Sequence, residues 1–238
     1  MLEPFRFKHF SALHERSAMK IGVDAVLIGA WTRGTPANIL DVGCGCGVIS
    51  LILAQRFRQA RIYGIDIDKE SVEEAHENFR NSPWSCRLKA DLKNFPKDLD
   101  AESPKYDLIV SNPPYFRSGI DNPSTPREKA RHQASLSVFS LIQEAPEFLN
   151  YNGSLSLIFP FDFLNDVLCC CQNQRWSVTG ICKVRDNDRK PFKRVMMQLT
   201  KAEPTVDLAT KVEELTLFNN GKPTNGYLQL CHDFYLKF

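Results

Sequence analysis

The fold is decided by the stretch Asn38-Ile39-Leu40-Asp41-Val42-Gly43-Cys44-Gly45-Cys46-Gly47, which runs directly into Val48-Ile49-Ser50-Leu51-Ile52-Leu53-Ala54. The hydrophobic period changes from 2 towards 3.6 across the glycines, which is typical of a strand, a tight turn and a helix. Glycines in G-x-G-x-G spacing let the backbone approach a ligand closely. The dinucleotide fingerprint G-x-G-x-x-G needs a glycine where Val48 stands, so a pyrophosphate cradle is disfavoured.

Two further predicted strands end in carboxylates. Arg61–Asp66 follows the glycine turn, and its acid, about 20 residues on, is placed to accept both hydroxyls of a ribose. Residues 86–90 predict a third strand, which ends in Asp91. Both acids belong to the edge of the sheet where open α/β folds bind ligands.

A fourth predicted strand, Tyr106–Ser111, runs into Asn112-Pro113-Pro114-Tyr115. Two adjacent prolines cannot continue a β ladder, so the strand ends at an amide side chain with an aromatic ring beside it. An amide that accepts hydrogen bonds, next to a ring that stacks, favours a site for an amino group on a flat substrate. A proline-rich turn with a capping asparagine is the alternative.

Bulk composition limits the class of protein. With 238 residues, 43% hydrophobic and 24% charged, the chain is typical of one globular α/β domain. No apolar run approaches the roughly 20 residues of a membrane span, and the N-terminus lacks the apolar core of a signal peptide. The eight cysteines are too sparse for a disulfide scaffold and lack C-x2-C zinc spacing. We therefore expect a cytoplasmic protein with reduced cysteines and neither a metal nor a membrane partner; the oligomeric state is not readable, and a monomer is the expectation.

The net charge of +2 is too small to indicate nucleic-acid binding by itself, but the cations are unevenly distributed along the sequence. Residues 183–194 hold six cations and predict an exposed hairpin turn between two strands. A phosphate clamp for RNA is the functional interpretation, and a solvated face is the alternative. The candidate RNA-binding residues in the hairpin are Arg189, Lys190, Lys193 and Arg194, and those in the loop after Tyr115 are Arg117, Arg127 and Arg131.

Alternating strands and helices predict a mostly parallel seven-stranded sheet with helices on both faces and an antiparallel C-terminal hairpin. We expect one domain over residues 1–238, in which residues 1–36 form an N-terminal extension. The expected strands are residues 38–42, 61–66, 86–90, 106–111, 154–159, 177–184 and 194–200. The expected helices are residues 24–31, 48–57, 71–80, 136–148 and about 163–171.

The glycine turn, Asp66, Asp91 and Asn112-Pro113-Pro114-Tyr115 occur in an order that resembles class I S-adenosylmethionine-dependent methyltransferases acting on amino groups. Residues 14–24 and 27–31 and the closing Phe234-Tyr235-Leu236 are similar to the bacterial family that methylates the amino group of adenine 37 in valine tRNA. The resemblance covers nearly the whole chain. It implies a Rossmann-like fold, S-adenosylmethionine as cofactor and the anticodon loop of a tRNA as partner.

The resemblance also implies roles for single residues. Asn112 and the Pro113 carbonyl accept hydrogen bonds from the target amino group, and Tyr115 stacks on the base. Asp41 contacts the methionine amino group or anchors the loop. The N-terminal extension, residues 1–36, is expected to fold over the cofactor site, and its Lys20 binds the methionine carboxylate or is a surface cation. The remaining cofactor residues are Gly43, Gly45 and Gly47 for the methionine portion, Asp66 for the ribose and Asp91 for the adenine.

Three other functions share some of these motifs. Enzymes that methylate a glutamine amide in release factors carry the same Asn-Pro-Pro-Tyr but a separate helical domain before it. Enzymes that methylate guanine in ribosomal RNA usually end the motif in Phe and carry a duplicated domain. A catalytically silent RNA-binding subunit is disfavoured because Asn112 and Tyr115 are intact.

Overall fold

The computed structural model describes residues 3–17, 19–100, 104–114, 136–201 and 210–237. The strands are β1 (Phe5–Arg6), β2 (Ser11–Ala12), β3 (Asn38–Val42), β4 (Arg61–Asp66), β5 (Leu88–Leu92), β6 (Tyr106–Ser111), β7 (Leu149–Pro160), β8 (Ser177–Asn187), β9 (Arg194–Thr200), β10 (Lys211–Asn219) and β11 (Lys222–Pro223). The α-helices are α1 (Val23–Trp31), α2 (Val48–Arg56), α3 (Lys69–Arg80), α5 (Val138–Glu144), α6 (Leu164–Asn173) and α7 (Asn225–Cys231). Single 3-10 turns occupy Ser85–Arg87, Ala145–Glu147 and Phe161–Phe163.

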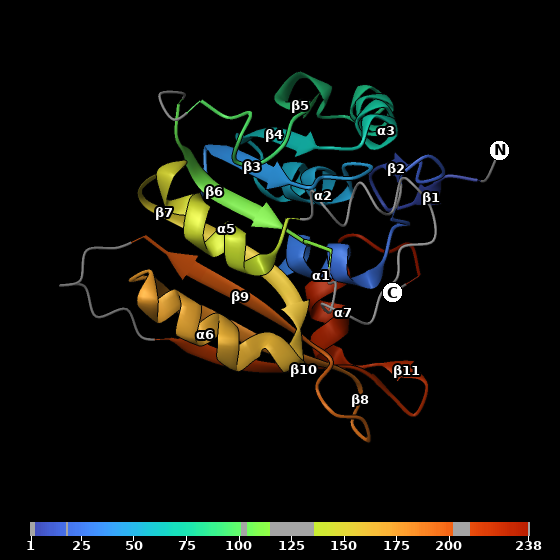
Figure 1. Cartoon of the computed structure of the whole chain (residues 1–238). Coiled ribbons are helices and arrows are strands. Elements are labelled where there is room, and N and C mark those ends of the chain that lie inside the picture. Colours follow the sequence, from blue (N-terminus) through green and yellow to red (C-terminus); the bar gives the residue numbers. More distant parts are fainter. Residues whose placement is uncertain (1–2, 18, 101–103, 115–135, 202–209, 238) are drawn as a thin grey trace, which may run out of the picture.

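Within these residues, nine strands form one sheet in the order β11-β10-β8-β9-β7-β6-β3-β4-β5 (Figure 1). The strands from β5 to β7 are parallel, and β9 runs antiparallel to both β7 and β8. The predicted class, a mostly parallel α/β sheet with an antiparallel C-terminal hairpin, is confirmed. Beyond the seven predicted strands, β10 adds in parallel to β8 and β11 pairs with β10, so the sheet continues past residue 200.

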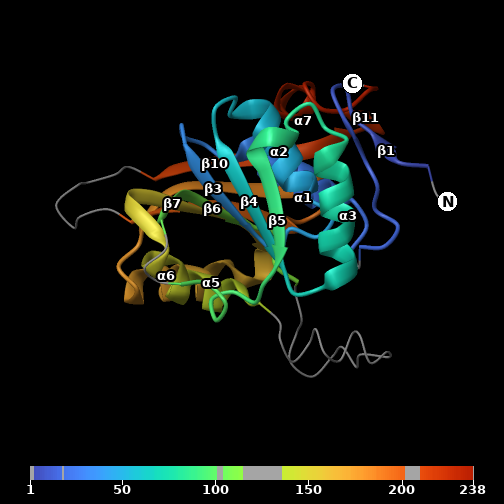
Figure 2. The ribbon, with the colours of Figure 1, turned by 90° about the horizontal axis from the view of Figure 1, so that it is seen from above.

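Helices cover both faces of the sheet, because parallel central strands bury both of their faces. Figure 2 shows α5 and α6 on one side, and α1, α2 and α3 on the other. Neighbouring residues of one strand therefore enter opposite cores: Ile39 packs with the α1–α3 layer, and Leu40 with the α5–α6 layer. Neither side chain is exposed. No helix among the described residues has the length and apolar character needed to cross a membrane.

The two ends of the described chain pack together. Phe7 forms an isolated antiparallel bridge with Tyr235, and their rings stack with centroids 6.1 Å apart. The Lys8 N–H also donates to the Phe234 carbonyl at 2.8 Å. The N-terminal extension is thus fastened to the residues that follow α7.

The sheet changes direction of winding at β3, which lies between β4 on one side and β6 on the other. Connections that leave a strand pair in opposite directions open a crevice outside the carboxyl ends of those strands. Asp41-Val42 and Ser111 end the two strands that flank this crevice. The candidate site is built there.

Candidate active site

The turn between β3 and α2 depends on glycine. Gly43, Gly45 and Gly47 have φ angles of 72°, 55° and 80°, which side-chain-bearing residues rarely adopt. A Cβ on Gly47 would lie 2.4 Å from Cε1 of Phe79, so helix α3 packs directly against the turn. The N–H groups of Gly43 and Cys44 donate to the Ile65 carbonyl at 2.8 and 3.0 Å, which fixes the turn beside the end of β4.

Asp66 is oriented by backbone donors on two sides. Its Oδ2 accepts from the Gly45 N–H at 2.8 Å, and its Oδ1 accepts from the Asp68 N–H at 2.9 Å. The side chain is therefore held in one orientation at the wall of the crevice. A carboxylate is an acceptor suited to ligand hydroxyls.

A pocket with an empty volume of about 850 Å³, including its open mouth, lies at this edge of the sheet. Gly43, Gly45 and Asp66 line it together with Asn112 and Pro114. The amide that follows β6 thus shares one pocket with the glycine turn. Pro113 is buried beside them. Tyr115, Arg117, Arg127 and Arg131 lie outside the described residues.

Asp41 is fully buried beneath the glycine turn. Its Oδ2 accepts from the N–H and the hydroxyl of Ser50, at 3.1 and 2.7 Å, so it anchors the start of α2. Its Oδ1 is buried and has no hydrogen-bond partner within the described part of the chain. Loss of solvation raises the pKa of Asp41 from 3.8 to about 7. One oxygen therefore holds the turn, and the other retains an unused acceptor.

Four predicted cofactor residues do not line the pocket: the buried Asp41 and Gly47, and the more exposed Asp91 and Lys20. Asp91 lies at the end of β5, where its Oδ2 accepts from the Tyr63 hydroxyl at 2.8 Å and from Lys89 Nζ at 2.6 Å. Lys20 is exposed, and its Nζ donates to the carbonyls of His14 and Glu15 at 2.8 and 3.0 Å. Both side chains are occupied by neighbouring residues of this chain.

The basic hairpin lies at the same edge of the sheet as the pocket. Pro160, which ends β7, pairs with Arg194, which begins β9, so the turn between β8 and β9 projects from the carboxyl edge. Arg189, Lys190 and Lys193 are exposed there. Lys193 Nζ lies 3.8 Å from Asp186 Oδ2, a loose surface pair.

Arg194 differs from the other cations of the hairpin. It is only 6% exposed, and its guanidinium lies 3.1 Å from Asp24 Oδ1 and 3.0 Å from Asp186 Oδ1. It joins the start of α1 to the hairpin. The structure therefore does not leave Arg194 accessible for the predicted contact with RNA, because its place at the start of a buried strand turns it inward.

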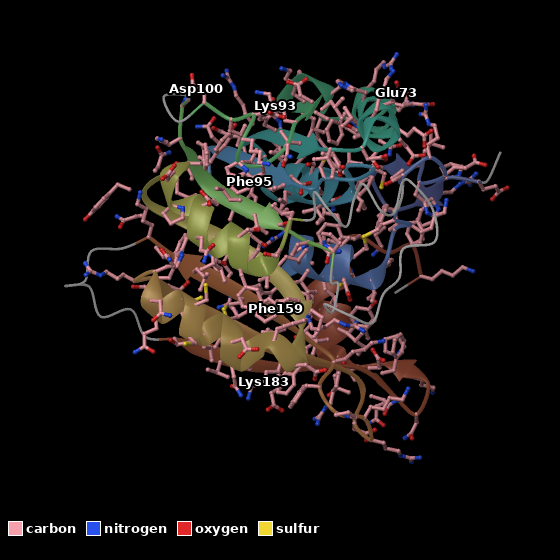
Figure 3. The ribbon with its side chains drawn as sticks, viewed as in Figure 1. Glu73, Lys93, Phe95, Asp100, Phe159 and Lys183 are labelled. Carbon is pink, nitrogen blue, oxygen red and sulfur yellow. The ribbon has the colours of Figure 1, made fainter. Side chains whose placement is uncertain are left out.

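The pocket also includes residues that the sequence did not single out. Lys93 and Phe95, whose side chains are labelled in Figure 3, belong to the segment after β5. Both line the pocket. Ser17 and Met19 line it from the N-terminal extension. The extension was expected to fold over the site, but the motif pattern pointed to Lys20 rather than to these neighbours.

Comparisons with known proteins agree on one class. The family model of the methyltransferase small domain matches residues 22–162. The chain is 36% identical over 234 residues to the tRNA1(Val) (adenine(37)-N6)-methyltransferase of Vibrio vulnificus strain YJ016, covering 98% of this chain and 95% of that protein. It is 37% identical over 243 residues to the protein of the same name from Christiangramia forsetii, covering 99% and 98%.

A crystal structure described as a predicted O-methyltransferase from Agrobacterium tumefaciens has the same fold. It matches with a TM-score of 0.66 at 19% sequence identity, covering 89% of this chain and 96% of that one. At this identity the likeness concerns the fold alone.

Proposed function

The chain belongs to the family of the tRNA1(Val) (adenine(37)-N6)-methyltransferases, and on that premise we propose that it methylates the exocyclic amino group of adenine 37 in the anticodon loop of valine tRNA. The methyl donor is S-adenosylmethionine. The observation that carries the proposal is the single pocket shared by Asn112 and Pro114 with Gly43, Gly45 and Asp66. Residues suited to an amino group and residues suited to the cofactor thus meet at one place.

The residues present fit S-adenosylmethionine, which supplies a methyl group already activated by a sulfonium. The positive φ angles of the turn favour glycine at these positions. Because glycine has no side chain, the cofactor can approach the backbone of the turn closely. Asp66 offers acceptors for ribose hydroxyls. The buried Oδ1 of Asp41, which lacks a hydrogen-bond partner within the described residues, is an acceptor for an ammonium group. Asp91 and Lys20 are less well placed for the adenine and carboxylate roles proposed for them, since other side chains and carbonyls hold them.

The chain contributes to the reaction mainly through position. The Asn112 side chain and the Pro113 carbonyl accept hydrogen bonds from the adenine amino group, which directs its lone pair at the methyl group. These acceptors also stabilise positive charge as it develops on nitrogen, an interaction stronger in the transition state than in the ground state. Tyr115 stacks on the base. No dedicated general base is needed, because the amino proton becomes acidic only after methyl transfer.

We place the tRNA backbone against the hairpin turn. Asn112 and the turn are separated by β7 and β9, and adjacent strands lie about 4.8 Å apart, so the lateral distance is roughly 10–15 Å. Arg189, Lys190 and Lys193 are then within reach of phosphates flanking a splayed base. Arg117, Arg127 and Arg131, which lie outside the described residues, are proposed as further contacts with the tRNA. We also propose that the enzyme is cytoplasmic and forms a single domain over residues 1–238.

The relative from Vibrio vulnificus, which matches 98% of this chain, is named as a methyltransferase of adenine 37 in valine tRNA. This likeness favours valine tRNA as the substrate over a glutamine amide or a ribosomal guanine. The deciding experiment is mass spectrometry of tRNA nucleosides from cells that lack the protein. We expect loss of one N6-methyladenosine from valine tRNA, restored by the wild-type gene and not by an Asn112→Ala variant. In vitro, purified protein should methylate valine tRNA and leave a transcript with guanosine at position 37 unmodified. Methylation of that transcript would overturn the assigned position.

A further inference from the structure

One face of helix α3 carries three buried polar side chains, Ser71, Glu74 and Asn78, none more than 2% exposed. Their spacing of i, i+3 and i+7 places them in one row along the helix. A buried carboxylate is costly unless it is well hydrogen-bonded. The partners of Glu74 therefore show what this row does.

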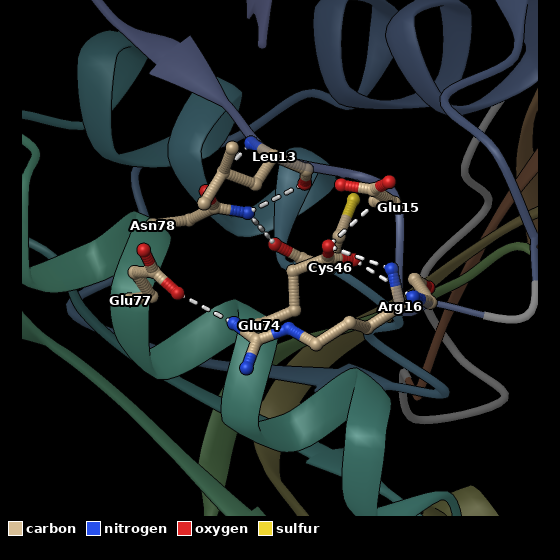
Figure 4. A network of polar contacts seen from close by, with 8 residues as sticks. Leu13, Glu15, Arg16, Cys46, Glu74, Glu77 and Asn78 are labelled. Carbon is tan, nitrogen blue, oxygen red and sulfur yellow. Dashed lines mark hydrogen bonds and ion pairs between the residues drawn. The ribbon is translucent and has the colours of Figure 1, made fainter. Parts of the chain in front are cut away.

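Glu74 receives three consecutive backbone N–H groups from the N-terminal extension (Figure 4). Its Oε1 accepts from Glu15 and Arg16 at 2.7 and 2.9 Å, and its Oε2 accepts from Ser17 at 2.8 Å. Successive N–H groups that converge in this way form an anion-binding concavity. Here the anion is supplied by α3 of the same chain.

Asn78 extends this contact in two directions. Its Oδ1 accepts from the Leu13 N–H at 2.7 Å, and its Nδ2 donates to the Leu13 carbonyl at 2.9 Å. The same Nδ2 donates to the carbonyl of Cys46, in the glycine turn, at 2.8 Å. One helix face thus binds residues 13–17, which we call the N-terminal strap, and the turn that carries the cofactor glycines.

The strap ends in the wall of the pocket. Ser17 lines the pocket, as does Met19 two residues further on. A Cβ on Gly45 would lie 3.3 Å from the Ser17 hydroxyl, so strap and glycine turn are in close contact. The Ser17 hydroxyl also lies 3.3 Å from that of Ser71. A displacement of residues 15–17 would therefore open the pocket on this side.

We propose that Glu74 is a positioning residue of the cofactor site, which holds the N-terminal strap so that Ser17 and Met19 form one wall around S-adenosylmethionine. The inference rests on the proposed function for the identity of the cofactor. Three donors converge on the two oxygens of a carboxylate. Glutamine has a single acceptor oxygen, and its NH2 group would face a donor, so Glu74→Gln breaks the arrangement while keeping the volume of the side chain.

The test compares Glu74→Gln with Glu77→Gln in the full-length protein. Glu77 lies one position before Asn78 and also contacts the strap, but through an exposed pair with Arg16 Nη2 at 2.5 Å. For Glu74→Gln we expect the Kd for S-adenosylmethionine, measured by calorimetry, and its KM to rise about tenfold or more. The kcat at saturating cofactor and the Kd for tRNA should change less than about threefold. Glu77→Gln should match the wild type in all four.

A second measurement needs no variant. Because coupling between sites is reciprocal, S-adenosylhomocysteine bound to the wild-type protein should slow hydrogen exchange at the amides of Glu15, Arg16 and Ser17. A lower unfolding temperature of Glu74→Gln with an unchanged cofactor Kd would show a purely structural role and overturn the proposal, as would unchanged exchange in the strap. Failure of the wild-type protein to bind S-adenosylmethionine would instead overturn the proposed function.

Discussion

Asp66 Oδ2 accepts a 2.8 Å hydrogen bond from the backbone N–H of Gly45, so the carboxylate that ends β4 is fastened to the turn that follows β3. Two motifs 21 residues apart in the sequence therefore form one rigid unit of the pocket. The position of the turn and the orientation of the acid cannot vary independently. A substitution of Asp66 therefore tests the turn and the carboxylate together.

Asp66→Ala should raise the Kd for S-adenosylmethionine by about tenfold or more, as expected when hydrogen bonds to a charged group are lost. Asp68→Ala is the matched control, because Asp68 caps α3 by accepting from the Ser71 N–H and does not line the pocket. That variant should lose about 1 kcal/mol of stability while keeping its cofactor Kd. Calorimetry and thermal unfolding of both proteins separate the two effects. Equal Kd values in Asp66→Ala and wild type would remove Asp66 from the cofactor site.

Replacement of Arg189, Lys190 and Lys193 by Ala should weaken tRNA binding and reduce its salt dependence. Each lost phosphate contact lowers the slope of log K against log salt by roughly 0.7–0.9. The control pair Arg58→Ala and Arg61→Ala removes exposed cations around the start of β4, at the opposite edge of the sheet. Filter binding over a range of salt concentrations gives the slopes. An unchanged slope in the hairpin variant would show that these cations face solvent and do not contact the phosphates of the tRNA.

Arg194→Ala should behave differently from the other hairpin variants, because it removes the cation between Asp24 and Asp186. Loss of one partner of a buried pair costs about 3–5 kcal/mol, and the partly exposed carboxylates place this case toward the lower end. The thermal unfolding temperature should fall, while the salt slope of tRNA binding stays close to the wild-type value.

Asp41 predicts a pH dependence of stability. Loss of solvation raises the pKa of Asp41 from 3.8 to about 7, so between these values the folded protein retains a proton that the unfolded chain releases. The free energy of unfolding contributed by this group therefore falls as pH rises from about 4 to 7. Asp41→Asn imitates the protonated form and should remove that slope. Urea unfolding of both proteins across this pH range is the measurement, and parallel curves would contradict the raised pKa.

The central fold could be predicted because its signals are local. The structure gives β3, β4 and β9 the predicted bounds, since each strand is a short apolar run between turn residues. The strand β10 was missed. Its sequence, Lys-Val-Glu-Glu-Leu-Thr-Leu-Phe-Asn, carries three charges, and its pairing is parallel to β8. That pairing is set by distant residues, which a local pattern does not contain.

The candidate site could be predicted only in part. Asp66 ends β4, and Gly45 and Asn112 follow the ends of β3 and β6, where the fold itself directs side chains and turns to one edge. Glu74 was missed because a charged residue on an amphipathic helix is normally exposed. The signal was present as a polar row at Ser71, Glu74 and Asn78, but its meaning depends on the strap that packs on it. Arg194 was misjudged for the related reason that a cluster of cations does not show which member turns inward.

The last prediction concerns the chemistry at Asn112, which lines the pocket beside Pro114. Its side chain is proposed to act as charge develops on the adenine amino group, so Asn112→Ala should lower kcat far more than it raises the KM for tRNA. By analogy with the loss of one donor from an oxyanion hole, the reduction in rate should be about 10²–10³.

Asn112→Asp keeps the shape and an acceptor, and should retain more activity than Ala if acceptance of the amino hydrogens is the essential role. Tyr115→Phe, which keeps the stacking ring, should be mild, whereas Tyr115→Ala should weaken base positioning. Single-turnover methylation of valine tRNA at saturating cofactor gives these rates. A wild-type rate in Asn112→Ala, with its cofactor Kd unchanged, would show that methyl transfer does not depend on this amide and that the proposed mechanism is wrong.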